Sequence, residues 1–328
     1  MKNNQRRRVL KVMALSTSAL IMPHKLLAKK AELHSWHGNA LGAQTSIQLY
    51  HDDKQMADQI LAHCVKIISK YEKAFSLFDE NSEVSRLNKN GWINNASDEF
   101  VMLTKLSKQF NEETNGAFDI SIQPLWELYE KHFQSDEGSN LPNNIDQTID
   151  KVGSENIIIN NSDVILEKEG MGLSFNGIAQ GFITDKVTEF LSQKGFANTL
   201  IDMGEYRAGG AQASGEPWRI GLLDPFDAVS IADVIEMKTG AVATSGGYGN
   251  IFDLSGKHHH IFNPSSGLSS NLYASVTVRA SDATTADALS TAFSNMKIEE
   301  IKTILQARPD VEVRLTFNSG EVTAITSS

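Results

Sequence analysis

The sequence is poor in cysteine and, over most of its length, in basic residues. Its 328 residues include one cysteine, Cys64, which excludes an internal disulfide framework and a cysteine-based zinc site. Eight of the 30 Lys and Arg residues fall within residues 1–30, which contain no acidic residue. The remainder therefore has 22 basic and 40 acidic residues, a net charge of −18. A body this acidic is a poor general binder of nucleic acid or of an anionic membrane surface.

Several common site motifs are also missing. The chain has no Gly-x-Gly-x-x-Gly and no P-loop lysine, so it lacks the signatures of a dinucleotide-binding Rossmann fold and of a P-loop nucleotidase. It has no Gly-x-Ser-x-Gly, so a hydrolase-type serine nucleophile is not expected at the hydroxyl-rich turn 244–248. With few basic side chains, the body would have to bind a phosphorylated ligand through backbone amides and a metal ion.

Residues 1–30 have the pattern of an export signal. A basic start, Gln5-Arg6-Arg7-Arg8, precedes an apolar run over residues 12–22, which at about 11 residues is too short to span a bilayer. The paired arginines favour a twin-arginine signal, with an ordinary secretory signal as the alternative. No other apolar stretch is long enough for a transmembrane helix. We therefore expect a signal peptide over 1–30, one domain over 31–328, and a periplasmic location with inner-membrane association as an alternative.

The rest of the chain mixes helical and strand patterns without strict alternation, which favours the α+β class. The hydrophobic content of 41% is enough to form a core. Apolar spacing predicts helices over 53–75, from Ser97 to Gly116, and over 178–194, 284–296 and 299–307. The polar segment 134–148 is predicted to be a surface loop. Predicted strands are 199–203, 274–280 and two hairpins, 157–166 and 311–325.

Two polar side chains of the predicted helix 284–296 suit a hard metal ion. Asp287 and Thr291 are four residues apart, so they share one helix face and present a carboxylate and a hydroxyl together. Oxygen ligands of this kind suit Mg²⁺ or Ca²⁺ better than zinc. An ordinary solvated helix face is the alternative interpretation of the same spacing.

Glycine is concentrated in the middle of the chain. Fifteen of the 23 glycines lie between Gly170 and Gly256. The turn 176–181 places glycines at the start of a predicted helix, where free backbone N–H groups can meet phosphate oxygens and a free carbonyl can serve a metal. A tight strand-to-helix turn is the alternative interpretation.

Three consecutive histidines occupy positions 258–260. They cannot all surround one tetrahedral ion, because neighbouring side chains of an extended segment point to opposite faces. We therefore expect His260 to point inward, as an acid–base group or phosphate partner, and His258 and His259 to be exposed.

Six short segments follow one another in a fixed order along residues 40–296. They are FSLFD with SEVSRLN (75–88), TNGAFDIS with PLW (114–126), SFNGIAQG (174–181), VATSG (242–246), HIFNPSSG (260–267) and ADALSTA (286–292). In this order they resemble the signature motifs of the ApbE family, the FAD:protein FMN transferases. Each motif is weak alone, and the shared order makes the resemblance specific.

The resemblance implies an α+β fold, with a mixed sheet, packed helices and two lobes around a glycine-rich cofactor cleft. It implies transfer of FMN from FAD to a Thr or Ser hydroxyl of a periplasmic or membrane-associated acceptor protein, with release of AMP. It also implies Mg²⁺ held by Asp287, Thr291 and the main chain of Gly177, and a base at His260. The flavin contacts that it implies are Leu41, Phe78, Ala117, Phe118, Asp119, Ser174, Gln180, Thr244, Ser245 and Phe262. Phe78 and Phe118 would pack a cofactor ring, with simple core packing as the alternative.

Three positions depart from the family pattern by losing a charge. Ser174 and Asn263 stand where the family has aspartate, and Gln180 stands where it has lysine. These departures keep two alternatives open. One is a Mg²⁺-dependent FAD hydrolase, in which water replaces the acceptor. The other is an FAD-holding maturation factor for a periplasmic reductase, without transfer activity.

Overall fold

The computed structural model describes residues 31–134, 140–227 and 229–327. The predicted signal segment, residues 1–30, lies outside them. The helices are α1 (Lys54–Phe75), α2 (Glu83–Asn90), α3 (Asp98–Glu113), α4 (Gln123–Gln134), α5 (Ile145–Ile149), α6 (Ala179–Gln193), α7 (Ala283–Phe293) and α8 (Ile298–Ala307). The strands are β1 (Glu32–Ala40), β2 (Ala43–His51), β3 (Trp92–Ile93), β4 (Ile157–Asn160), β5 (Asp163–Leu166), β6 (Thr199–Asp202), β7 (Tyr206–Gly209), β8 (Trp218–Leu223), β9 (Ile231–Met237), β10 (Thr239–Ser245), β11 (Ser275–Ala280), β12 (Glu312–Thr316) and β13 (Val322–Thr326).

One eight-stranded sheet, in the order β1-β2-β6-β7-β10-β11-β12-β13, is the centre of the molecule. The elements confirm the α+β class. All pairings of this sheet are antiparallel, so the expected mixed sheet is wrong in this respect. The physical reason is that short turns join β1 to β2, β6 to β7 and β12 to β13, and a short turn can connect only antiparallel neighbours.

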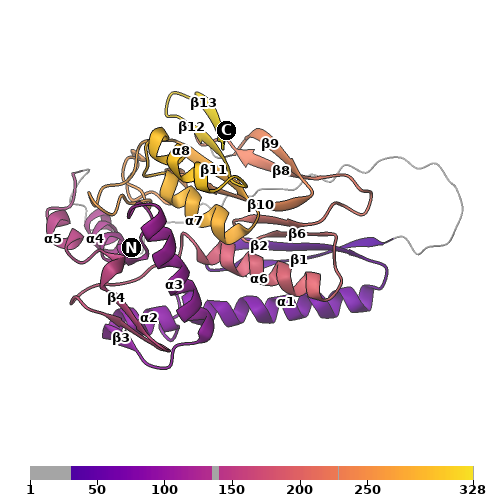
Figure 1. Cartoon of the computed structure of the whole chain (residues 1–328), viewed down its shortest axis with the longest axis horizontal. Helices are drawn as coiled ribbons and strands as arrows, with labels where there is room; N and C mark the ends of the chain where they lie inside the picture. Colours follow the sequence, from indigo (N-terminus) through magenta and orange to yellow (C-terminus); the bar gives the residue numbers. More distant parts are fainter. Residues whose placement is uncertain (1–30, 135–139, 228, 328) are drawn as a thin grey trace, which may run out of the picture.

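The two faces of this sheet are covered differently. Helices α1, α6 and α7 lie along one face, and the hairpin of β8 and β9 packs on the other (Figure 1). Strand β10 shows how alternation produces this arrangement. Ala241 and Ala243 belong to the core under the helices, whereas Val242 belongs to a second core with Trp218 of β8. The sheet is therefore buried on both sides where it carries the predicted site.

The helices predicted from apolar spacing are confirmed. Helix α1 begins after Asp53, whose side chain accepts a hydrogen bond from the N–H of Met56, and α3 begins after Ser97, which caps it in the same way. Cys64 is fully buried on the inner face of α1, as a packed core thiol. The chain after α6 reverses at Gly195, whose φ of 84° favours glycine.

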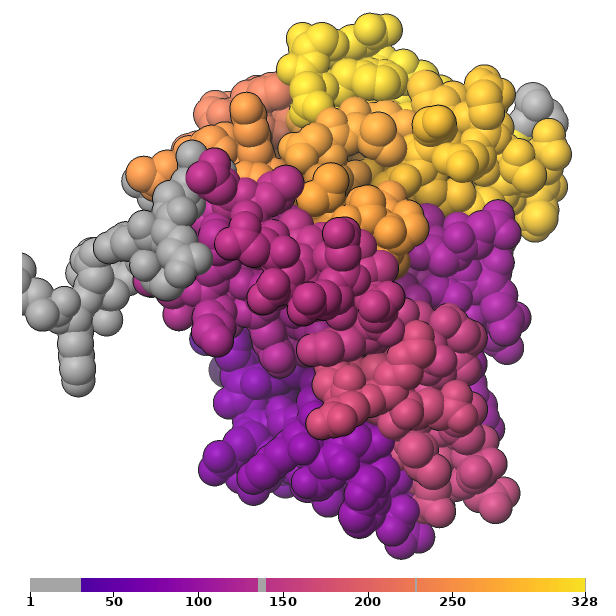
Figure 2. All heavy atoms as spheres, turned by 90° about the vertical axis from the view of Figure 1, so that its left-hand side faces the viewer, coloured from indigo at the N-terminus to yellow at the C-terminus, as the bar shows by residue number. Residues whose placement is uncertain are grey.

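A smaller region packs at one end of the sheet. The three-stranded sheet β3-β5-β4 lies with α2 and α3 in the lower left of Figure 1. The predicted loop over 134–148 is wrong at its end, because α5 covers 145–149. Ile145 is buried there in an apolar cluster with Leu125, Tyr129 and Phe262. In Figure 2 the magenta segment that includes α4 and α5 adjoins the orange segment around residues 250–270.

Within the described ranges, no helix combines the length and the apolar character that crossing a bilayer would require.

Candidate functional site

Helices α6 and α7 are tied together through the carboxylate of Asp185 on α6. It is buried and accepts hydrogen bonds from the first N–H groups of α7, those of Ala283 and Thr284, at 2.8 and 2.9 Å. Arg207 on β7 pairs with the same carboxylate. Burial raises the pKa of Asp185, while Arg207 and these hydrogen bonds oppose the shift. Asp185 therefore fixes where α7 begins, and with it the face that carries Asp287.

Asp287 makes the reciprocal contact from α7 to the start of α6. Its side chain is 3% exposed, so the alternative of a solvated helix face is wrong. Its Oδ2 accepts a hydrogen bond of 2.9 Å from the N–H of Gly181. Burial raises the pKa of Asp287 to about 7, a shift that the bond from Gly181 opposes and the charge of Asp185 reinforces. A buried carboxylate of this kind is a strong ligand for a hard cation.

The hydrogen bond from Gly181 to Asp287 also leaves the carbonyl of Gly177 without its usual helical partner, so that this carbonyl can face a ligand. In a regular helix the N–H of Gly181 would donate to the carbonyl four residues earlier, which is that of Gly177. Here it donates to Asp287 instead. Thr291 lies on the other side of the same turn, since a Cβ built at Gly177 would be 2.9 Å from its Oγ1. The structure therefore brings together Gly177, Asp287 and Thr291, the three predicted cation ligands.

Gly181 allows this close approach of α6 to α7. A Cβ at this position would lie 2.3 Å from the carbonyl oxygen of Ala283 and 2.8 Å from the Cβ of Asp287. We expect Gly181→Ala to lower the free energy of unfolding by about 1–3 kcal/mol, because α7 must move away. Denaturant unfolding measures the change. Ser192→Ala on the exposed face of α6 is the control, and equal stability of the two variants would contradict this packing.

A row of hydroxyl groups continues from Thr291 to the end of β10. The Oγ of Ser245 lies 2.7 Å from that of Ser290 and 3.4 Å from the Oγ1 of Thr291. Thr244, one residue earlier, pairs its Oγ1 at 2.9 Å with that of Thr277 on β11. Ser245 is thus at the predicted cation site, while the Thr244 hydroxyl is turned to the neighbouring strand.

Sequence reasoning missed Glu205, which lies in the turn between β6 and β7. Its side chain is buried, and its Oε2 has no hydrogen-bond partner among the described residues. Burial and the charges of Asp287 and Asp202 raise the pKa of Glu205 well above its ordinary value, against the bond from the N–H of Thr244. A single acidic residue in a short turn belongs to no periodic hydrophobic pattern, so the sequence did not indicate a role for Glu205. Only the fold brings it to Asp287.

The three histidines lie differently from the prediction. His259 was expected to be exposed, but it is the most buried of them, because its N–H donates to the Oγ of Ser269 and its ring lies under Gly247. His260 is half-buried, with its ring beside Trp126 and Gly249. His258 is half-buried too, and its ring stacks on Phe133. The run therefore positions two imidazoles beneath the loop that follows Ser245.

The ring of His260 has a defined tautomer. Its Nδ1 lies 3.1 Å from the carbonyl oxygen of Asn250, which can only accept, so Nδ1 carries the proton. Nε2 is then an acceptor with no hydrogen-bond partner among the described residues. Burial lowers the pKa of His260 to about 4, with a smaller contribution from His259. His260 is therefore neutral near pH 7 and can accept a proton at Nε2.

Other predicted flavin contacts are held together by α7 and α3. Asn295, just beyond α7, donates through Nδ2 to the carbonyls of Ala117 (3.2 Å) and Phe262 (3.0 Å). Phe118 is 2% exposed and packs on Phe110, so the core-packing alternative describes its ring. Asp119 accepts five hydrogen bonds, from the N–H and Oγ of Ser121 and of Ser154 and from Nδ2 of Asn111. Contact of these residues with flavin stays a prediction.

Leu41 and Phe78 form a separate group beside the β1–β2 turn. Leu41 has a φ of 48° and donates its N–H to Oε1 of Glu72. The ring of Phe78 is 62% exposed and lies against Gly42, so the core-packing alternative is wrong for it. An exposed aromatic ring beside a constrained turn is suited to stacking on a planar ligand.

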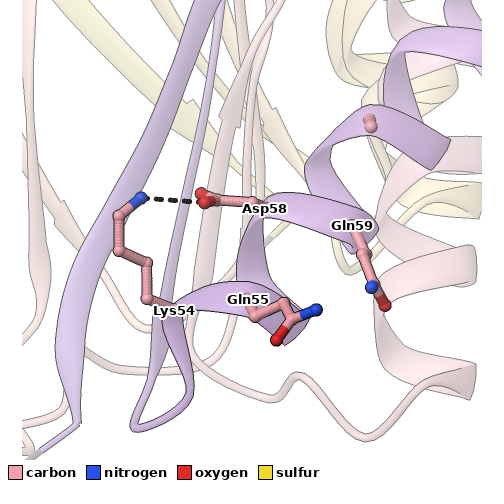
Figure 3. Close-up of a pocket in the computed structure, with 5 residues that line it drawn as sticks. Lys54, Gln55, Asp58 and Gln59 are labelled. Atoms are coloured by element: carbon pink, nitrogen blue, oxygen red, sulfur yellow. Dashed lines mark hydrogen bonds and ion pairs between the residues drawn. The ribbon is translucent and has the colours of Figure 1, made fainter.

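A shallow hollow at the start of α1 is unrelated to this site. Lys54, Gln55, Asp58 and Gln59 line it together with Ala62, and Lys54 pairs with Asp58 at 2.8 Å (Figure 3). Both charged side chains are largely exposed, and such a pair contributes only a few tenths of a kcal/mol, ~0.3–0.5. The hollow is therefore a solvated helix face.

A sequence model of the ApbE family matches residues 41–315. The chain belongs to the ApbE family. It is similar to proteins named FAD:protein FMN transferase from Klebsiella pneumoniae and Vibrio cholerae. The Klebsiella protein is 27% identical over 289 residues, 85% of this chain and 88% of the relative. The Vibrio protein is 28% identical over 298 residues, 85% and 86% of the two chains.

Solved structures of ApbE proteins share this fold. The ApbE protein of Thermotoga maritima superposes with a TM-score of 0.77 at 29% identity, over 89% of this chain and 96% of that one. The flavin transferase ApbE of Vibrio cholerae gives 0.76 at 24% identity, over 91% and 98%. Both confirm the ApbE-like α+β architecture.

The three departures from the ApbE motifs have defined local roles. The Oδ1 of Asn263 accepts hydrogen bonds from the N–H and Oγ of Ser265 and from the N–H of Ser266. An aspartate side chain would form the same turn, because it offers an oxygen at the same place. Gln180 donates to the carbonyl of Met203 at 2.8 Å. Ser174 is buried, and its Oγ lies 3.4 Å from the N–H of Asn176. The turn before α6 and the turn that begins at Asn263 are thus both formed without these charges.

Proposed function

We propose that this chain is an FAD:protein FMN transferase. It moves FMN from FAD to the hydroxyl of a Ser or Thr in an acceptor protein and releases AMP. The observation that carries the proposal is the meeting of Asp287, Thr291 and the Gly177 carbonyl between α6 and α7. The names of the curated relatives support the same reaction.

The donor set at α7 fits Mg²⁺. A carboxylate, a hydroxyl and a carbonyl are hard oxygen ligands, and the charge of Asp287 acts on Glu205, whose Oε2 has no hydrogen-bond partner within the described residues. Within the described part of the chain, no three or more His, Cys, Asp or Glu side chains are grouped to hold a metal, so the proposed ligand set consists of one carboxylate with a hydroxyl and a carbonyl oxygen. When bound, Mg²⁺ would supply positive charge to the pyrophosphate of FAD.

The protein's own groups would act on the acceptor. In the transfer, the acceptor oxygen forms a bond to the FMN-side phosphorus of FAD, and the bond from that phosphorus to AMP breaks. The proton of the acceptor hydroxyl passes to Nε2 of His260. This nitrogen carries no hydrogen, because the hydrogen bond to the carbonyl of Asn250 keeps the ring proton on Nδ1. Ser245 and Thr291 would hold phosphate oxygens through their hydroxyls. Alignment and charge neutralisation supply most of the catalysis in such a step.

The acceptor is proposed to be a periplasmic or membrane-associated flavoprotein. The basic start and short apolar run within residues 1–30 support export, and the excess of acidic residues in the rest of the chain argues against a nucleic-acid partner. FAD is the flavin donor and Mg²⁺ the cofactor of the proposed reaction.

Intact-protein mass spectrometry tests the proposal. The full chain, FAD and Mg²⁺ are incubated with a flavoprotein subunit that naturally carries Ser- or Thr-linked FMN and was produced without a transferase. We expect the subunit to gain one FMN, and chelation of the cation with EDTA to reduce the transfer rate by at least about a hundredfold. Free FMN plus AMP without labelled subunit would instead support FAD hydrolysis, and retention of intact FAD would support a maturation factor.

A further inference from the structure

Glu205 is buried in a position that its own turn does not explain. It is 7% exposed, and it follows Gly204, which takes up a φ of 97° in the turn from β6 to β7. One oxygen accepts from the N–H of Thr244 on β10. The other, Oε2, is shielded from solvent and has no partner within the described residues. Leaving a buried carboxylate oxygen without a donor costs free energy unless a ligand compensates for it.

Two chains of contact connect this turn to the predicted cation ligands. On one side, Gln180 donates to the carbonyl of Met203, and the next residue, Gly181, donates to Asp287. On the other, Thr244 is followed by Ser245, whose Oγ lies 3.4 Å from that of Thr291. The turn that carries Glu205 is thus held against α6 through Gln180 and faces β10 through Thr244, and both of these residues neighbour groups of the predicted cation site.

The charges near Glu205 are all negative. Asp287 and Asp202 both act on it electrostatically, and neither Glu205 nor Asp287 forms an ion pair with a Lys or Arg in the described ranges. Arg207, the basic side chain nearest in sequence, is paired with Asp185 instead. Two buried carboxylates without a basic partner are favourable when a divalent cation lies between them.

We propose that Glu205 is the second carboxylate that faces the divalent cation at Asp287, Thr291 and Gly177. This inference rests on the proposed function, because it assumes the same cation. It gives Glu205 a positioning role: with Asp287 it balances the two charges of the cation, and it contacts neither flavin nor acceptor. The competing explanation is a neutral, protonated Glu205 that only fills space.

Cation binding without FAD separates these explanations. Mn²⁺ serves as the probe, and electron paramagnetic resonance counts free Mn²⁺ in titrations of the full chain. Glu205→Gln has the shape of the protonated acid, so a space-filling role predicts unchanged affinity. We expect Glu205→Gln to bind Mn²⁺ about 10- to 100-fold more weakly. Glu205→Asp, which keeps the charge, should retain more affinity than the glutamine variant.

Asp202→Asn is the matched control, because Asp202 lies in the same turn and its Oδ1 accepts the N–H of Gly204, which asparagine can also do. Its Mn²⁺ affinity should stay near that of the unmodified chain.

Equal affinity of Glu205→Gln and the unmodified chain would overturn the inference and leave the transfer reaction standing. If the unmodified chain binds no Mn²⁺, the cation site fails, and the inference fails with it. Thermal unfolding of each variant shows that it is folded.

Discussion

Asp287→Asn is expected to lower FMN transfer by about a thousandfold. Asparagine has the size of aspartate, and its amide oxygen can still accept the N–H of Gly181 at the start of α6. What it lacks is the charge. Since Asp287 is the carboxylate of the predicted cation set, the pyrophosphate of FAD would lose its counter-charge in the reaction.

The fold should survive this change. Burial raises the pKa of Asp287 to about 7, so the carboxylate is costly in the absence of a cation. We therefore expect Asp287→Asn to unfold at the same or a higher temperature than the unmodified chain when no divalent ion is present. Differential scanning calorimetry with EDTA measures this, and a large drop in stability would instead indicate a structural role.

Asp282→Asn is the matched control for charge on the same helix. Asp282 caps α7 by accepting hydrogen bonds from the N–H and Oγ1 of Thr285, whereas Asp287 accepts the N–H of Gly181. Asparagine is as good an N-cap as aspartate, so its transfer rate, measured by acceptor mass in single turnovers, should stay within about twofold. Equal loss in the two variants would contradict a specific role for Asp287.

The sequence predicted the helices well because their apolar spacing is long and regular. Helices α1, α3, α6, α7 and α8 all lie where that spacing placed them. Single positions were less reliable. In α1 the apolar Met56 is 45% exposed, whereas Ala57 and Leu61 are buried. The spacing of apolar residues identifies a helix. The packing of α1 against α6 and the sheet then decides which side chains at the edges of its apolar face are buried.

The site was predictable where one helix carries it and not where separate strands meet. Asp287 and Thr291 are one turn apart, so their shared face followed from spacing alone. Glu205 reaches Asp287 only through the pairing of β7 with β10, and strands β8 and β9 lie between these two in the sequence. His259 was misplaced because an isolated bridge to Ile251, with the bond to Ser269, turns it inward. Long-range pairing of this kind leaves no local pattern.

The last prediction concerns His260, which shares no bonded contact with the cation ligands and so tests a different part of the mechanism. His260→Gln is expected to lower transfer by about 10²–10⁴-fold, the usual contribution of a positioned base. Glutamine can still donate to the carbonyl of Asn250, but it offers no basic nitrogen to the acceptor hydroxyl. FAD and Mn²⁺ binding should be unchanged. His258→Gln is the control, because the ring of His258 belongs to the same histidine run but stacks on Phe133.

The pH profile distinguishes a base from a merely structural histidine. Burial lowers the pKa of His260 to about 4, below the ordinary 6.5, so the proton-accepting form is the major one above that pH. Transfer should fall as the pH decreases toward 4 and stay level from pH 6 to 8. An exposed histidine would lose half its activity already near pH 6.5.

The acid limb of kcat/KM, measured with saturating Mg²⁺, should disappear in His260→Gln. Because Nδ1 donates its hydrogen to the carbonyl of Asn250, protonation at Nε2 must account for the whole pH dependence. An unchanged limb in the variant would therefore assign the titration to another group and remove His260 from the proton transfer.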